Sequence, residues 1–140
     1  VSITGVTLEF RWADKGVAIP IRVEPTLPLT VAAEAVAPYL GHYDFEWADS
    51  TSQPRRSVFT VDQRGEQLFG TWDTPQLGSM REMQLLPNGP DRFAYGWYRN
   101  GSLWATSVEL NLVFEKQKGQ VVGFTYRTPT EIVARGTRRP

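Results

Sequence analysis

The sequence contains no cysteine, and this absence excludes several kinds of chemistry at once. Disulfides cannot form, thiolate ligands for a metal are missing, and no cysteine can act as a nucleophile. The absence does not assign a compartment, because exported proteins can also lack cysteine. Histidine is nearly missing as well, since His42 is the single one in 140 residues. One histidine cannot build a multi-histidine metal site, so we expect neither a metal nor a cofactor.

Net charge and long apolar runs are also lacking. The 15 basic and 15 acidic side chains give a formal net charge of zero, so nothing indicates a nucleic-acid or membrane-surface partner. The small basic end made by Arg135, Arg138 and Arg139 is expected to be a solvated tail. No apolar run approaches the ~20 residues that a membrane helix needs, so no membrane partner is expected.

The chain begins at Val1 rather than at a methionine, and it carries no recognisable signal peptide. We therefore expect a mature form, a trimmed form or a fragment of something longer. A length of 140 residues suits one domain with its own core.

Aromatic and β-branched residues punctuated by Gly and Pro are plentiful, and they favour strands. Eight strand-like segments follow one another from Gly41, at residues 41–47, 57–62, 66–72, 80–86, 93–98, 104–116, 120–127 and 131–136. Short turns join most of them without helical crossovers, so the sheet should be antiparallel. We predict an all-β, up-and-down barrel of eight strands (8–10 with the N-terminal segments), lipocalin-like in shape. Mid-strand Gly96 and Gly123 are expected to mark bends at its corners.

One short helix is predicted near Thr30–Leu40. Thr30 is expected as its N-cap and Gly41 as its terminator, while Pro38 should limit it to a couple of turns. A short helix before a run of strands usually plugs or flanks one end of a sheet.

The N-terminal segment repeats a phrase of the C-terminal one, because residues 3–7 line up with residues 121–125. We divide the chain into an N-terminal hairpin (1–24), a Pro-rich linker (25–30) and the barrel (31–140). The hairpin is the end of a preceding barrel in a tandem array, or an addition to this barrel or to a partner chain's barrel, which would favour a homodimer. A third interpretation is that two ordinary hairpins share Gly and Thr.

Candidate chemistry is sparse. His42 and Asp44 share a strand face, where they could form an ion pair or a hydrogen bond, and an acid–base role would need a partner across the barrel. Glu109 and Glu115 fall on the face opposite Val108, Leu110, Leu112 and Phe114, which are predicted to point inward. No catalytic residue is assigned, because no Ser-His-Asp order, phosphate loop or nucleotide motif is present.

Large aromatic rings form the most informative group. Either they fill a dry barrel core, or they line a cavity for a small apolar ligand, with Trp and Tyr supplying polar tips. A Trp ladder on the outer surface for polymer stacking is a third interpretation. The candidate ligand-binding residues are Tyr43, Phe45, Trp47, Trp72, Phe93, Tyr95, Trp97, Phe124 and Tyr126.

An ordered set of phrases between about Val36 and Ala134 resembles one known family. They are "PYLGHYDF", "FTVDQRGEQLFG", "MQLLPNGPDRFAY" and "LVFEKQKGQVVGFTY". The chain resembles the lipocalin-like C-terminal accessory barrel of bacterial serine β-lactamase-like and penicillin-binding-protein-like hydrolases, including D-aminopeptidase and esterase relatives. Residues 47–56 and 98–106 are longer than the family's usual connections.

In that family the catalytic Ser and Lys lie in a separate domain, and their Ser-x-x-Lys motif does not occur here. The resemblance therefore implies a non-catalytic accessory or binding module, exported or periplasmic, that shapes substrate access or oligomer contacts beside an upstream hydrolase domain. One alternative is a free-standing carrier of a small apolar ligand. Another is a small barrel enzyme that uses His42 and a carboxylate.

Overall fold

The computed structural model describes residues 6–12, 15–21, 27–48, 54–72 and 82–140. In chain order the elements are β1 (Val6–Trp12), β2 (Lys15–Ile21), α1 (Ala33–Val36), η1 (Ala37–Tyr39), β3 (Gly41–Ala48), β4 (Pro54–Arg64), β5 (Gln67–Trp72), β6 (Glu82–Pro87), β7 (Arg92–Arg99), β8 (Ser102–Gln117), β9 (Gln120–Arg127) and β10 (Ile132–Arg138). Among these described elements no helix has the length and apolar character to cross a membrane.

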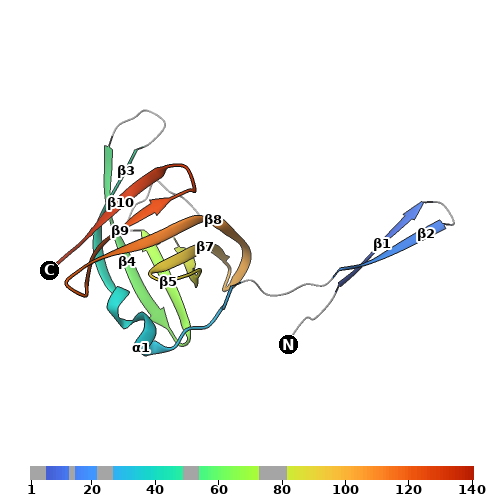
Figure 1. The fold of residues 1–140 in the computed structure, drawn as a ribbon, viewed down its shortest axis with the longest axis horizontal. Helices are drawn as coiled ribbons and strands as arrows, with labels where there is room; N and C mark the ends of the chain where they lie inside the picture. Colours follow the sequence, from blue (N-terminus) through green and yellow to red (C-terminus); the bar gives the residue numbers. More distant parts are fainter. Residues whose placement is uncertain (1–5, 13–14, 22–26, 49–53, 73–81) are drawn as a thin grey trace.

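The eight strands from β3 to β10 form a closed barrel (Figure 1). Each strand pairs antiparallel with the next one in the chain, and β10 closes the ring by pairing with β3. The predicted fold class is therefore confirmed, down to the eight strands that follow one short helix. Closure leaves the barrel sheet without the free edges that invite aggregation.

β1 and β2 form a separate two-stranded antiparallel sheet. The register sets Val6, Leu8 and Phe10 opposite Ile21, Ile19 and Val17. The barrel closes without these strands, so among the described residues the hairpin is not part of the barrel sheet. A preceding tandem barrel, a homodimer and the boundaries at residues 24 and 30 stay predictions.

The helix differs from its prediction at its start. It begins at Ala33 with Ala32 as N-cap and with no capping side chain, so the assignment of Thr30 is wrong. The backbone explains the shift, because the amide of Val31 donates to Glu66 O at 2.7 Å and holds this stretch extended against the β4–β5 turn. Pro38 lies in the first turn of η1, and Gly41, with a φ of +136°, opens β3.

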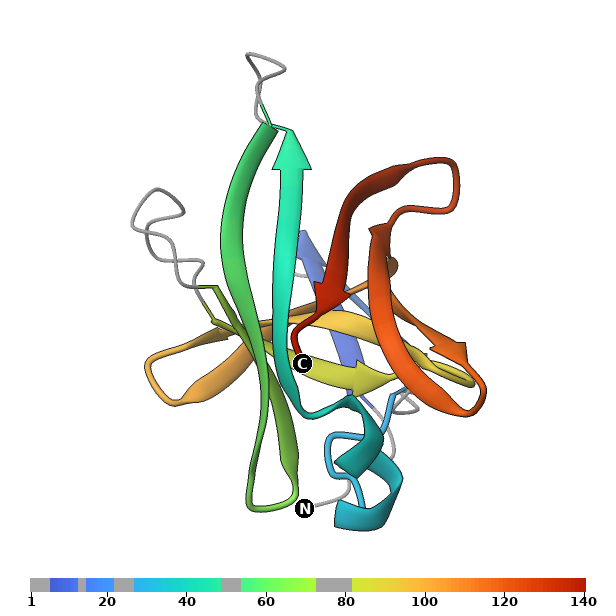
Figure 2. The same cartoon turned by 90° about the vertical axis from the view of Figure 1, so that its left-hand side faces the viewer.

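α1 and η1 lie at the end of the barrel where β3 begins (Figure 2). Arg138, at the end of β10, ties this helical turn to the barrel. Its guanidinium donates to the carbonyls of Pro38 at 2.7 Å and Leu40 at 2.8 Å, and to Val121 O at 3.4 Å. The expectation of a solvated basic tail is therefore wrong for Arg138, because three backbone acceptors converge on it.

Replacing Arg138 with Leu is expected to lower the free energy of unfolding by about 2 kcal/mol, because charged hydrogen bonds to three carbonyls are lost. Urea denaturation measures the loss, and amide exchange should localise the opening to α1 and η1. Arg139→Leu is the matched control. Its pair with Asp44 joins two exposed side chains, so it should cost below about 1 kcal/mol. Equal losses in the two variants would contradict the anchoring role of Arg138.

In β8 a bulge interrupts the alternation of side chains, so the predicted inward face is correct only in part. Its pairing with β7 jumps from Asn111 opposite Ala94 to Ser107 opposite Tyr95, so three residues of β8 bulge out. Asn111 Nδ2 donates to Val108 O at 2.8 Å within this bulge. Val108 is consequently 52% exposed rather than inward, while Leu112 and Phe114 are buried as predicted and Leu110 packs against the core.

The barrel core is built from aromatic rings. Phe124 of β9 is its centre, with ring centroids 5.3 Å from Tyr43, 5.7 Å from Phe45, 5.0 Å from Phe59 and 5.7 Å from Phe114. Tyr43 is fully buried, and its hydroxyl donates to Tyr39 O at 2.6 Å. Most of the interior next to α1 and η1 is therefore filled by side chains.

Candidate functional site

The far end of the barrel, opposite α1, is where β3, β5, β7 and β9 finish. Aromatic side chains gather near these strand ends and at the start of β8. We call five of them the aromatic ladder: Trp72, Tyr95, Trp97, Trp104 and Tyr126. Their ring centroids are 6.2 Å apart for Trp104 and Trp97, 4.7 Å for Trp97 and Tyr95, 6.5 Å for Tyr95 and Trp72, and 6.2 Å for Tyr95 and Tyr126.

Exposure falls along the ladder from rim to interior. Trp104 is 63% exposed, Trp97 and Tyr126 are half-buried, and Tyr95 and Trp72 are buried. Tyr95 and Trp97 are two residues apart on β7, so their side chains lie on the same face of the strand. The register irregularity after Trp97 leaves Trp104 as an extra residue of β8, beside Trp97. The ladder is a continuous path of rings from solvent into the core.

Of the three buried polar atoms that lack hydrogen-bond partners among the described residues, two belong to the inner face near the ladder. They are the indole Nε1 of Trp72 and the hydroxyl of Ser57. Phe59 of β4 pairs with Trp72, and Ser57 lies two residues before Phe59, so both side chains belong to the inner face. Buried polar atoms are usually paired, and these two are the candidates for contact with a bound molecule.

The surroundings of the ladder disfavour negative charge. Burial raises the pKa of the Tyr95 phenol to about 12. Burial also raises the pKa of Tyr126, and the neighbouring Tyr95 adds to that shift. Both phenols are therefore neutral donors at physiological pH, suited to hydrogen bonding rather than to proton transfer.

The structure divides the nine predicted ligand-binding residues into groups. Trp72, Tyr95, Trp97 and Tyr126 come together in the ladder, while Tyr43, Phe45, Phe93 and Phe124 belong to the packed core. The side chain of Trp47 lies outside the described part of the chain. The role of any of them in ligand contact stays a prediction.

Sequence reasoning missed two members of this region. Trp104 was not selected because alternation does not define a face at a register irregularity. Ser57 is not among the predicted ligand-binding residues, although its spacing from Phe59 predicts the same inner face.

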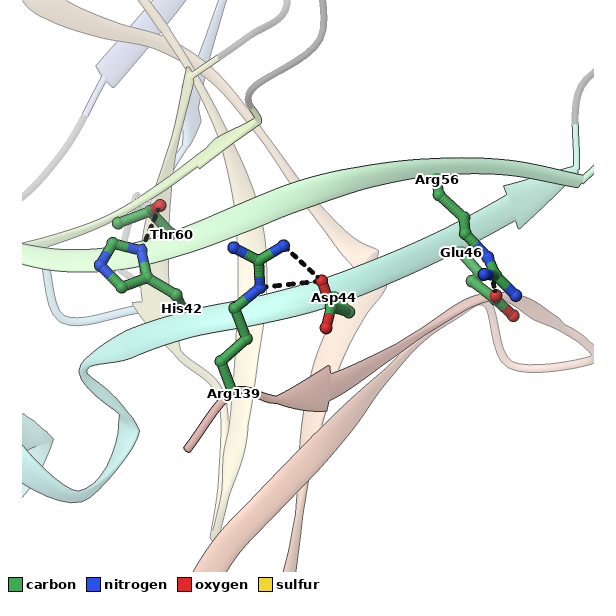
Figure 3. Close-up of polar contacts among 6 residues, drawn as sticks. All are labelled: His42, Asp44, Glu46, Arg56, Thr60 and Arg139. Carbon is green, nitrogen blue, oxygen red and sulfur yellow. Dashed lines mark hydrogen bonds and ion pairs between the residues drawn. The ribbon is translucent and has the colours of Figure 1, made fainter.

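A polar strip runs along the outer wall of β3 (Figure 3). His42 Nδ1 lies 3.0 Å from Thr60 Oγ1, Arg139 donates to Asp44 at 2.6 Å, and Arg56 pairs with Glu46 at 2.6 Å. The expected contact between His42 and Asp44 is therefore wrong, because Arg139 occupies the carboxylate and Thr60 meets the imidazole. Apart from the half-buried Thr60, these side chains are exposed, as are the outward-facing Glu109 and Glu115.

A second polar cluster closes the end of the barrel beside η1. The Tyr39 hydroxyl donates to Asp91 Oδ1 at 2.6 Å, and Lys116 Nζ lies 2.5 Å from the same oxygen. The hydrogen bond from Lys116, followed by that from Tyr39, lowers the pKa of Asp91. Every charged group of this cluster is paired, so we assign it a structural role.

Two surface hollows among the described residues lie away from the ladder. One of about 480 Å³ lies beside Val121, Arg138 and Arg139, and one of about 340 Å³ lies among Arg92, Asn111 and Arg127 on the outer wall. Neither is lined by a ladder residue. In the part of the chain that is described, no three His, Asp or Glu side chains gather as a metal site would require.

The fold and the ladder together define a class: a closed, antiparallel, eight-stranded β-barrel, plugged by a helical turn at one end and lined with aromatic rings at the other. No protein-family model, no curated protein and no solved structure matches the chain. The resemblance to hydrolase accessory barrels therefore stays a prediction that rests on the sequence phrases.

Proposed function

We propose that this chain is a non-catalytic binding module that takes up a small apolar aromatic ligand at the aromatic ladder. The ladder itself carries the proposal, because its rings lead from the 63% exposed Trp104 to the buried Trp72. Ligand sites are lined mainly by hydrophobic and aromatic side chains, and Trp and Tyr combine an apolar body with a polar tip. A lone exposed Trp would need no such explanation.

Binding is favoured over catalysis by the position of the titratable groups. His42 lies on the outer wall, hydrogen-bonded to Thr60, so it is not placed to act inside the barrel. The ladder and Ser57 supply only neutral side chains. An enzyme built on His42 and a carboxylate in a shared cavity thus finds no geometric support.

Two biological settings suit such a module. As a free-standing carrier it would hold the ligand for transport or storage. As an accessory barrel of a serine β-lactamase-like hydrolase it would shape substrate access or oligomer contacts, and this setting rests on the sequence resemblance alone. A partner hydrolase domain, a homodimer and an exported location belong to the same proposal.

Binding of 1-aminoanthracene, a neutral probe whose fluorescence rises in apolar surroundings, tests the proposal. Trp97→Ala and Trp104→Ala should each weaken binding about 3- to 10-fold, because each removes a stacking ring worth about 1 kcal/mol. Titration followed by probe emission and by quenching of Trp fluorescence gives the dissociation constants.

Tyr98→Ala is the matched control. Tyr98 follows Trp97 on β7 but lies on the outer face, where its ring packs 4.9 Å from Phe69. It should leave probe binding unchanged within about twofold. Absence of saturable binding, or equal weakening by Tyr98→Ala and Trp97→Ala, would refute a site at the ladder.

A further inference from the structure

The buried donors beside the ladder point to the chemical class of the ligand. Resting on the proposed function, we infer that the site selects an uncharged aromatic molecule bearing a hydrogen-bond acceptor, such as an aryl ketone, over the corresponding aryl carboxylate. The inference depends on Trp72, on Ser57 and on the neutrality of the ladder.

Trp72 supplies the first donor. The residue is only 7% exposed, and its Nε1 has no acceptor among the described residues. An indole N–H can only donate, and leaving it buried without an acceptor costs about 1–3 kcal/mol. Two of the neighbouring rings, Phe45 at 5.9 Å and Phe59 at 5.4 Å, offer no oxygen. The third, Tyr95 at 6.5 Å, carries a hydroxyl that makes no hydrogen bond with this nitrogen. A ligand oxygen reaching this nitrogen would recover that cost.

Ser57 supplies the second donor. It pairs with Phe45 across β3 and β4, and Phe59, two residues further on, pairs with Trp72. The hydroxyl is buried and unpartnered like the indole nitrogen. A carbonyl oxygen can accept a hydrogen bond from either kind of donor.

Two ring-to-ring steps separate the rim of the barrel from Trp72. From Trp97 at the rim, one step of 4.7 Å leads to Tyr95 and one of 6.5 Å leads to Trp72. We place the aromatic body of the ligand on the outer rings, with its acceptor directed along this path toward Trp72. The aromatic body supplies the affinity, and the acceptor supplies the orientation.

The side chains of the ladder are all uncharged, and this favours a neutral ligand. No ladder side chain carries a positive charge that could balance a carboxylate, and burying an uncompensated anion is far more costly than burying a neutral carbonyl. The raised pKa of Tyr95, which is caused by burial, reports the same resistance to negative charge. Buried, neutral donors of the protein therefore favour a ligand whose acceptor is also neutral.

Three probes of similar shape test the inference on the full chain at pH 7: naphthalene, 2-acetylnaphthalene and 2-naphthoate. Calorimetry or Trp quenching should show 2-acetylnaphthalene binding about tenfold tighter than naphthalene, because the ketone satisfies a buried donor. The carboxylate should bind at least about tenfold more weakly than the ketone.

Trp72→Phe should reduce the preference for the ketone over naphthalene to about twofold or less, while naphthalene binding persists. Ser57→Ala is the second variant, and it tests the inference even if Trp72→Phe fails to fold. It should reduce the preference for the ketone over naphthalene about threefold. Thr71→Ala is the control. Its buried hydroxyl also lacks a partner, but it alternates with Trp72 and lies on the other face of β5, so it should leave the preference unchanged.

The outcomes separate the two proposals. Naphthalene binding with no preference for the ketone, or 2-naphthoate binding as tightly as the ketone, would overturn this inference and leave the binding module standing. Persistence of the full ketone preference in the folded variants would overturn it as well. Failure of all three probes and of 1-aminoanthracene to bind would overturn both.

Discussion

Replacing Phe124 with Ala is expected to lower the free energy of unfolding by about 3–5 kcal/mol, a large part of what a domain of this size has available. Phe124 is 2% exposed and contacts four other core rings, from β3, β4 and β8. Truncation leaves a cavity at the point where these strands meet. The surrounding rings are held by closed-barrel pairing, so they can collapse into that cavity only partly.

Urea denaturation of Phe124→Ala beside Trp104→Ala checks this expectation. Trp104 is 63% exposed and belongs to the ladder, so its truncation should change the free energy of unfolding by less than about 1 kcal/mol. A loss below about 1.5 kcal/mol for Phe124→Ala would mean that the barrel interior is not closely packed around this ring. The same pair of variants separates the rings that build the fold from those proposed to bind.

The alternation of side chains predicts which rings point into the barrel, but not whether these rings fill it or surround a space. The spacing of Tyr43 and Phe45 on β3 correctly predicts that both rings enter the barrel, as it does for Phe93 and Tyr95 on β7. It does not say whether inward rings meet one another or surround a space. The depth of each ring depends on barrel stagger, which is set by strand pairings between distant parts of the chain.

The fold itself was largely accessible from the sequence because each barrel strand carries its own signal. Short turns and regular alternation indicate an antiparallel meander, and the eight-strand ring follows. The errors occurred where a long-range contact overrides a local preference. Thr30 is a good N-cap residue, yet the hydrogen bond from Val31 to Glu66 delays the helix to Ala33.

The candidate site was only partly accessible for the same reason. Trp104 joins the ladder through an irregularity in β7–β8 pairing, and Val108 leaves the core through another. The extra residues of β8 are not Gly or Pro themselves, and the nearest such signal is Gly96 on the facing strand β7, which lies between the two irregularities. The partnerless Nε1 of Trp72 could not be found from the sequence, because hydrogen-bond satisfaction depends on every residue packed around the atom.

Gly123 is the position where the smallest possible side chain should have a very large effect. A Cβ on Gly123 of β9 would lie 2.4 Å from the backbone oxygen of Gly136 in β10. The obstacle is backbone rather than a side chain that could change rotamer, so β9 and β10 must separate to admit a methyl group. A register shift in the β8–β9 pairing lies immediately beside Gly123, at the position where the sequence predicts a bend.

Gly123→Ala is therefore expected to lower the free energy of unfolding by about 3 kcal/mol. β10 also pairs with β3 to close the ring, so displacing it disturbs both of its neighbours. Gly119→Ala is the matched control on the neighbouring β8–β9 turn. Its φ is +81° with open space around the missing Cβ, so it should cost only about 1 kcal/mol of backbone strain.

Urea denaturation gives the two free energies, and amide exchange shows where each variant opens. Gly123→Ala should expose the amides of β9, β10 and β3 to exchange, whereas Gly119→Ala should affect the turn alone. A Gly123→Ala protein as stable as the Gly119→Ala protein would show that β9 and β10 can separate at little cost. The β9–β10 pair would then be a weakly specified contact of the barrel rather than one of its most tightly specified ones.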